Sequence, residues 1–115
     1  MQIQIKRAYA EISPSDGKRI LVDRLWPRGI KKEDAKIDLW AKEITPSTEL
    51  RKWYAHDPEH WDEFQQRYRA ELRSQAELLQ QIREIAKQKK ISLITAAKSE
   101  RYNHVIVLKQ VLEER

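Results

Sequence analysis

Two short segments of the chain concentrate side chains that could bind an anion or move a proton. The first, residues 23–32, contains Asp23, Arg24 and Arg28. The planar guanidinium group of arginine suits a carboxylate or a phosphate, which it can bind through two parallel hydrogen bonds. Asp23 is a candidate general base, or a partner that orients one of the arginines. The alternative interpretation is an ion-pair network that only holds the segment in place.

The second segment, residues 98–104, leads into a predicted helix. Backbone N–H groups are free at a helix start and the helix dipole favours an anion there. Lys98 would add positive charge, and Asn103 and His104 follow it. We interpret His104 as a residue that handles a proton, although a hydrogen-bonded core histidine fits the same pattern. Lys98 taken alone is more typical of a solvated surface lysine.

Histidine spacing gives little reason to expect a metal. His56 and His60 are four residues apart, but Pro58 lies between them and Asp57 stands where a zinc protease motif has glutamate. We therefore predict capping or packing roles for both histidines, and no metal or other cofactor. With only two glycines in the chain, no glycine-rich phosphate loop can be built.

Tryptophan is frequent in the middle of the sequence. Trp53 and Trp61 have the spacing of a helical core face, so we expect them to pack inside the protein. Trp26 lies beside Pro27 in a predicted loop among arginines, where an aromatic ring could also stack on a nucleic-acid base.

Three strands are predicted to position these segments. Ile3 and Ile5 alternate with polar residues, and residues 19–23 and 91–97 are short apolar runs bounded by turn signals. The second and third strands end at the two candidate segments, and parallel strands would bring those ends to one edge of the sheet, where open α/β sheets bind ligands. Because the first connection is too short for a helical crossover, the first strand could instead pair antiparallel.

Helical patterns fill the remainder. Residues 38–42 are predicted to form one or two helical turns, and residues 45–47 to start a further helix. Asp57 is a predicted N-cap for residues 58–88, which as one helix would be about 46 Å long, so we predict a break at residues 73–75 where the apolar stripe lapses. The last helix is expected at residues 100–113.

Composition sets the general class. The 115 residues carry a net charge of +5 and no cysteine, and no stretch approaches the roughly 20 apolar residues of a membrane span. The first residues lack the pattern of a signal peptide. We predict a single α/β domain over residues 1–115, with a small, open, mostly parallel sheet flanked by helices, located in the cytoplasm and without a membrane partner.

Several of these residues also carry a family resemblance. The stretch from Leu21 to Gly29 (LVDRLWPRG), then WAKE from Trp40, PSTELR from Pro46, and AAK and NH around the second segment resemble the YeaO-like family, bacterial proteins of domain of unknown function 488. The resemblance covers nearly the whole chain and implies an α/β fold but no activity. It adds Arg51 to the candidate anion-binding residues. Longer members of the wider group carry Cys-His-Arg at residues 103–105, of which this chain keeps only His104.

Two classes of function follow from these observations. The first is a small enzyme or ligand-binding protein for a nucleotide or other phosphorylated anion, with Arg24, Arg28 and Lys98 around the anion and Asp23 or His104 handling a proton. The alternative is a non-catalytic module that binds nucleic acid through its basic charge, or a protein partner in regulation. Substrate, reaction and oligomeric state stay open.

Overall fold

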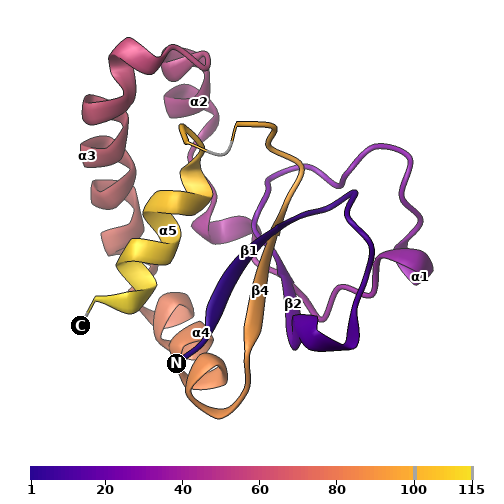
Figure 1. Cartoon of the computed structure of the whole chain (residues 1–115). Coiled ribbons are helices and arrows are strands. Elements are labelled where there is room, and N and C mark those ends of the chain that lie inside the picture. Colours follow the sequence, from indigo (N-terminus) through magenta and orange to yellow (C-terminus); the bar gives the residue numbers. More distant parts are fainter. Residues whose placement is uncertain (100, 115) are drawn as a thin grey trace.

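A four-stranded sheet with every strand parallel lies at the centre of the computed structural model, which describes residues 1–99 and 101–114 (Figure 1). The strands, in their order across the sheet, are β1 (Ile3–Arg7), β4 (Ile91–Thr95), β2 (Lys18–Leu21) and β3 (Leu39–Trp40). The expected α/β class with an open, mostly parallel sheet is confirmed.

The first strand is parallel because it does not pair with the second. β4 inserts between them, so Leu93 is opposite Ile5 on one side and opposite Ile20 on the other. The short connection from β1 to β2 therefore crosses β4 and returns to the other end of the sheet, with a 3-10 turn instead of an α-helix. The antiparallel alternative for β1, which is based on the shortness of this connection, is wrong.

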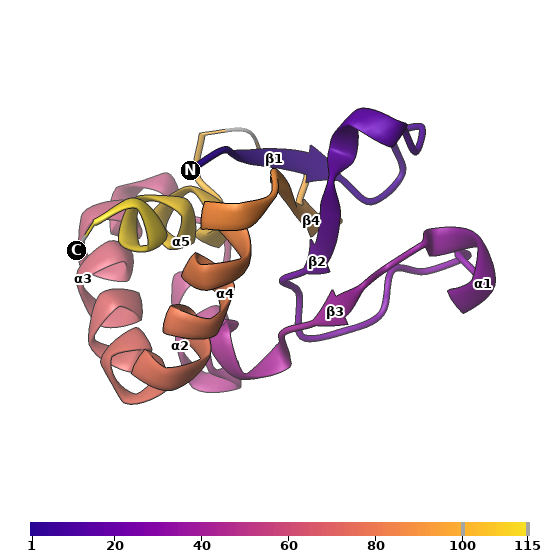
Figure 2. The same cartoon turned by 90° about the horizontal axis from the view of Figure 1, so that it is seen from below.

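Helices cover one face of the sheet and irregular segments cover the other (Figure 2). The helices on the first face are α2 (Thr48–Tyr54), α3 (Trp61–Leu72), α4 (Ala76–Gln88) and α5 (His104–Glu113). The other face carries the short helix α1 (Lys32–Ala35) and the loops around it. Residues alternate along the strands accordingly: Ile91 and Leu93 join the core beneath the helices, while Ile94 packs with Leu21 on the opposite face.

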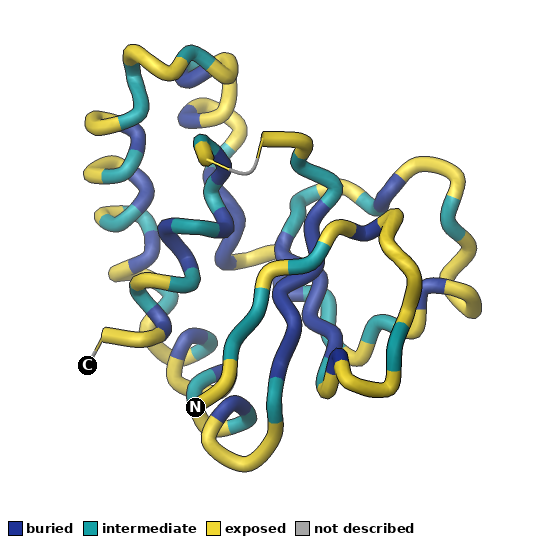
Figure 3. Tube along the Cα trace, in the orientation of Figure 1, coloured by how far each residue is buried: buried dark blue, intermediate teal, exposed yellow. Residues whose placement is uncertain are grey.

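Burial follows this layering, with the central strand β4 buried along its whole length (Figure 3). The predicted packing of Trp53 and Trp61 is confirmed, because both lie against the helical core. Trp26 and Trp40 pack on the other face, edge to face with ring centroids 5.4 Å apart.

The long helical pattern is interrupted where we predicted. A 3-10 turn, η4 (Arg73–Gln75), separates α3 from α4, and the two helices run in different directions in Figure 1. Asp57 caps a preceding 3-10 turn, η3 (Pro58–His60), by accepting a hydrogen bond from the Glu59 amide. The break keeps both helices on one small sheet.

Three of the expected helical segments have different boundaries in the structure. Residues 38–42 are not helical: they hold β3 and the start of a 3-10 turn, η2 (Lys42–Ile44), because Leu39 and Trp40 pair with Ile20 and Leu21 instead. The helix α2 starts after Ser47, whose hydroxyl accepts the Leu50 amide. The last helix begins at residue 104, and the expected start at residue 100 lies outside the described residues.

A buried ion-pair cluster holds the corner before β2. Asp16, in the 3-10 turn η1 (Pro14–Asp16), accepts hydrogen bonds from the Lys6 ammonium at 2.6 Å and the Arg19 guanidinium at 2.7 Å. Arg19 also donates to the Ala35 carbonyl. Gly17 follows with φ of 67°, a left-handed conformation that glycine adopts without strain.

None of the helices in the described residues has the length and apolar composition needed to cross a membrane.

Candidate functional site

A cleft of about 860 Å³ opens at the carboxyl ends of β2 and β4. Most of its lining residues come from four places: the segment after β2, α2 and the residues next to it, the segment after β4, and the first residues of α5. All seven residues predicted from the sequence line it: Asp23, Arg24, Arg28, Arg51, Lys98, Asn103 and His104. The parallel sheet is what brings the two candidate segments together, since it places both strand ends at the same edge.

Asp23 joins the two strand ends. One carboxylate oxygen accepts the Thr95 hydroxyl at 2.6 Å, and the other accepts the Ala96 amide at 2.7 Å. The Asp23 carbonyl accepts the indole N–H of Trp40 at 2.7 Å. Asp23 therefore has both carboxylate oxygens occupied within the protein, which suits an orienting role better than that of a free base.

His104, the first residue of α5, faces the same point. Its Nε2 lies 2.7 Å from the Val22 carbonyl oxygen and 3.5 Å from the nearer Asp23 oxygen. A carbonyl only accepts, so Nε2 carries the proton and the neutral ring keeps its lone pair on Nδ1. Burial lowers the pKa of His104, and Arg51 lowers it further, while Asp23 and the Val22 carbonyl oppose them. The net direction is downward, so the imidazole is neutral at pH 7 and Nδ1 can accept a proton or a hydrogen bond.

Two of the predicted anion ligands have their polar groups engaged inside the chain. Arg24 donates from Nε and Nη2 to the Pro46 carbonyl at 3.3 and 3.2 Å, which ties the segment after β2 to the start of α2. Asn103 is the N-cap of α5: its Oδ1 accepts the Val105 amide at 2.8 Å and its amide nitrogen donates to the Ser99 carbonyl. Both residues shape the cleft through these contacts.

The remaining basic residues give the cleft its charge. Five basic side chains line it, and Asp23 is the one acidic residue among its described lining residues. Arg28, Arg51 and Lys52 are exposed, and no described carboxylate lies within ion-pair distance of any of them. The lining thus carries four of the five net positive charges of the chain. Low-dielectric walls around such a cluster strengthen its attraction for an anion.

Sequence reasoning did not find the aromatic part of the cleft beyond Trp26. Tyr9, Tyr54 and Tyr102 also line it, together with Lys52 and His56. Tyr54 donates its hydroxyl to the Tyr102 carbonyl at 3.0 Å, and burial raises its pKa, so the phenol stays protonated. Tyr54 carries a core signal in the sequence, and Tyr9 and Tyr102 carry none, because only tertiary packing brings them to this edge.

The other histidines follow the packing prediction only in part. His60 stacks on Trp53 with ring centroids 4.7 Å apart. His56 instead lines the cleft with its backbone in the left-handed region, at φ of 58°. Over the described residues, no group of three or more His, Asp or Glu side chains is arranged to hold a metal ion.

The fold and the site thus define a class of protein: a parallel α/β protein with a basic cleft at the carboxyl edge of its sheet. A family model described as the "Inactive DUF488-N3 subclade" matches residues 2–115. The chain therefore belongs to the DUF488 family, and the resemblance to YeaO-like proteins is confirmed.

Similar proteins in two groups of bacteria extend this relationship. The uncharacterized protein YeaO of Escherichia coli is 48% identical over 108 residues, which cover 94% of each chain. The uncharacterized protein Rv3073c of Mycobacterium tuberculosis is 41% identical over 114 residues, covering 99% of this chain and 96% of its own. The uncharacterized protein Mb3100c of Mycobacterium bovis has the same identity and coverage. No solved structure matches the chain.

Proposed function

We propose that this protein binds a small anionic ligand in the cleft at the carboxyl edge of the sheet. The observation that carries the proposal is the charge of the lining: five basic side chains against Asp23, whose two carboxylate oxygens are already hydrogen-bonded. Protein charges usually pair nearby, as they do around Asp16, so an unbalanced cluster inside a concave site supports an anionic partner.

In this proposal the basic residues divide by role. Arg28, Arg51 and Lys98 project from three different elements and contact the anion, with Lys52 beside them. Arg24 and Asn103 hold the walls through their contacts with Pro46 and Ser99. Asp23 orients the site, and His104 offers Nδ1 to a hydrogen-bond donor on the ligand.

Binding without turnover is the form of this function that we favour. The family description contains the word "Inactive", and the chain has no cysteine that could act as a nucleophile. The neutral His104 with an available Nδ1 is the observation that favours the enzyme alternative, because it is positioned to accept a proton in the cleft. Chemical conversion of a bound ligand that is lost in His104→Gln would establish that alternative.

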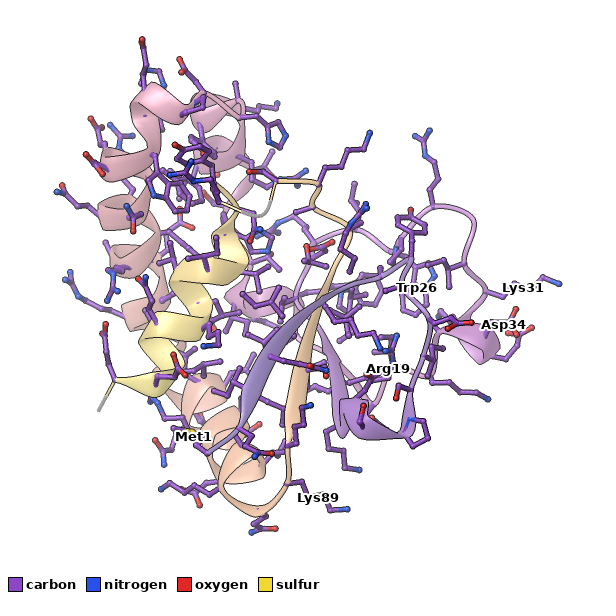
Figure 4. All side chains as sticks on the ribbon, viewed as in Figure 1. Met1, Arg19, Trp26, Lys31, Asp34 and Lys89 are labelled. Atoms are coloured by element: carbon purple, nitrogen blue, oxygen red, sulfur yellow. The ribbon has the colours of Figure 1, made fainter. Side chains whose placement is uncertain are left out.

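Calorimetric titration of the protein with inorganic pyrophosphate at low ionic strength tests the proposal. We expect saturable binding that weakens by about tenfold or more in Arg28→Ala and in Lys98→Ala, since each loses a charge-assisted contact. Lys89→Ala is the matched control: Lys89 is also an exposed lysine next to β4, but lies at the opposite end of the sheet (Figure 4). Binding that is absent, or equally strong in all three variants, would overturn the proposal.

A thermal-shift measurement provides an independent readout. A ligand that binds only the native state raises the unfolding midpoint by mass action. If short oligonucleotides alone raise the midpoint, and added salt abolishes the effect, the nucleic-acid alternative replaces the small-ligand proposal.

A further inference from the structure

Besides its positive charge, the cleft has several aromatic side chains in its walls. Three of the four tyrosines in the chain line it, and so does Trp26. Inorganic phosphate or an acyclic phosphorylated metabolite would leave such aromatic surface without a partner. Ligand sites usually match a few polar groups with apolar and aromatic walls that cover the rest of the ligand.

The polar atoms of these aromatic side chains are used inside the protein. The Tyr9 hydroxyl donates to the Arg28 carbonyl at 3.0 Å, and the Trp26 indole N–H donates to the Ile30 carbonyl at 2.6 Å. On the other side, the Tyr54 hydroxyl donates to the Tyr102 carbonyl. These contacts fix the rings. Tyr54 is buried and stacked on Phe64, and the guanidinium carbon of Arg7 lies 5.8 Å from the centre of the Tyr9 ring. The exposed Tyr9 and the half-buried Trp26 and Tyr102 therefore present the carbon surface that a ligand can contact. Such surfaces bind a planar ring by stacking or edge contacts.

Aromatic and basic groups are adjacent on both walls. On the first wall Tyr9 is hydrogen-bonded to Arg28, whose side chain is exposed. On the second wall Arg51 and Tyr54 are three residues apart on α2, which places them on neighbouring positions of one helix face. A ligand that carries both a planar ring and an anionic group would contact both kinds of surface at once.

We propose that the ligand of this cleft is a nucleotide unit, an aromatic base linked through its sugar to phosphate. This inference rests on the proposed anion-binding function and narrows it. The volume of about 860 Å³ exceeds what a bare phosphate fills and lies within the range of about 300–1,000 Å³ for small-molecule pockets. A free nucleotide and a nucleotide within a single strand share this chemistry.

The first experiment separates the ring from the anion. The protein is titrated with pyrophosphate, ribose 5-phosphate, the common nucleoside 5′-monophosphates and the corresponding nucleosides. We expect at least one nucleotide to bind about tenfold or more tightly than ribose 5-phosphate, because one stacked base adds that much affinity. Equal affinity for ribose 5-phosphate and every nucleotide would overturn the inference and leave the anion site standing. No binding by any phosphate compound would remove both.

Substitutions at two positions, the exposed Tyr9 and the half-buried Trp26, test the aromatic contact itself. Tyr9→Leu should lose the preference for the nucleotide over ribose 5-phosphate, while Tyr9→Phe, which keeps the ring and loses only the hydroxyl, should retain it. Nucleotide binding should also quench the fluorescence of Trp26, and the quenching should disappear in Trp26→Phe although binding persists. Unchanged preference in Tyr9→Leu together with no Trp26 signal would contradict the proposal.

The source of the nucleotide unit is decided in the same assay. If a single-stranded tetranucleotide binds more tightly than the mononucleotide, with an affinity that falls steeply with salt, the source is a nucleic-acid strand. If the mononucleotide binds as well as the tetranucleotide, the source is the free nucleotide.

Discussion

The segments before and after β2 both contain aspartate and arginine, but these residues have different roles in each segment. Before the strand, Asp16 is buried against the ammonium of Lys6 and the guanidinium of Arg19, so each charged group is paired inside the protein. After the strand, Asp23 accepts neutral donors and Arg24 donates to a carbonyl. The first segment is a closed, structural cluster, and the second leaves a positive cleft open to solvent. The two segments therefore differ more in whether their charged side chains pair with each other than in which residue types they contain.

The largest expected difference comes from removing the first aspartate. Asp16→Ala leaves the buried Arg19 without a counter-charge, and breaking a buried pair in this way costs about 3–5 kcal/mol of the free energy of unfolding. Asp23→Ala removes two hydrogen bonds to neutral groups and should cost about 1–3 kcal/mol. Urea denaturation measures both, with the exposed Asp62→Ala as control. Equal losses at Asp16 and Asp23 would break the comparison.

The two glycines of these segments, Gly17 and Gly29, give a second test of the comparison between the closed cluster and the open cleft. A Cβ added at Gly17 would lie 2.0 Å from the backbone carbonyl oxygen of Lys90, whereas one added at Gly29 would meet nothing within 4 Å. Both have positive φ, which costs a non-glycine residue about 1 kcal/mol or more. We therefore expect Gly17→Ala to lose about 3 kcal/mol or more and Gly29→Ala about 1 kcal/mol, measured by thermal unfolding. A milder effect at Gly17 would show that the corner can relax.

Acid should affect the closed cluster. Burial alone would raise the pKa of Asp16, but hydrogen bonds from Lys6, the Ser13 amide and Arg19 outweigh it and lower the pKa from 3.8 to about 2. A lowered carboxyl pKa stabilises the folded state above the unfolded value, and that stability is lost as pH falls from about 4 to about 2. The difference corresponds to about 2 kcal/mol. Urea denaturation across this range should show the loss in the wild type and a reduced one in Asp16→Asn.

The smallest effect concerns His104 in the cleft. Burial and Arg51 lower its pKa, and Asp23 raises it. An NMR titration should therefore give a pKa below 6.5, moving upward in Arg51→Ala, where a positive charge is lost, and downward in Asp23→Asn, where a negative charge is lost. No movement in either variant would show that neither charge acts on the ring.

Much of the architecture could be predicted from periodicity and length. β1 has alternating apolar and polar residues, and β2 and β4 contain short apolar runs. The break at residues 73–75 follows from the length that an unbroken helix would have. β3 could not be found this way, because two residues, Leu39 and Trp40, have no periodicity. The position of β4 between β1 and β2 depends on tertiary packing, which no local pattern encodes.

The candidate site could be predicted from the sequence for a related reason. Residues that lie a few positions after strands, such as Asp23 and Lys98, must gather at one edge if the strands are parallel. Site residues from other parts of the chain could not be predicted: Thr95 binds Asp23 from within a strand, and Tyr9 reaches the cleft from a different loop. The structure also shows that Asn103 acts as a helix cap, a role its sequence position permits as readily as ligand binding.

The central place of β4 also has a consequence for how the chain acquires its shape during synthesis. β1 and β2 have no hydrogen-bonded contact with each other and depend on Ile91–Thr95 as their shared partner. A nascent chain that has emerged only through α4 can pair β2 with β3 but has no partner for β1, so the sheet is completed late, across about 90 residues of separation. The edge of the sheet at which the cleft lies forms only when β4 is added. A truncated product that ends before β4 therefore lacks the cleft.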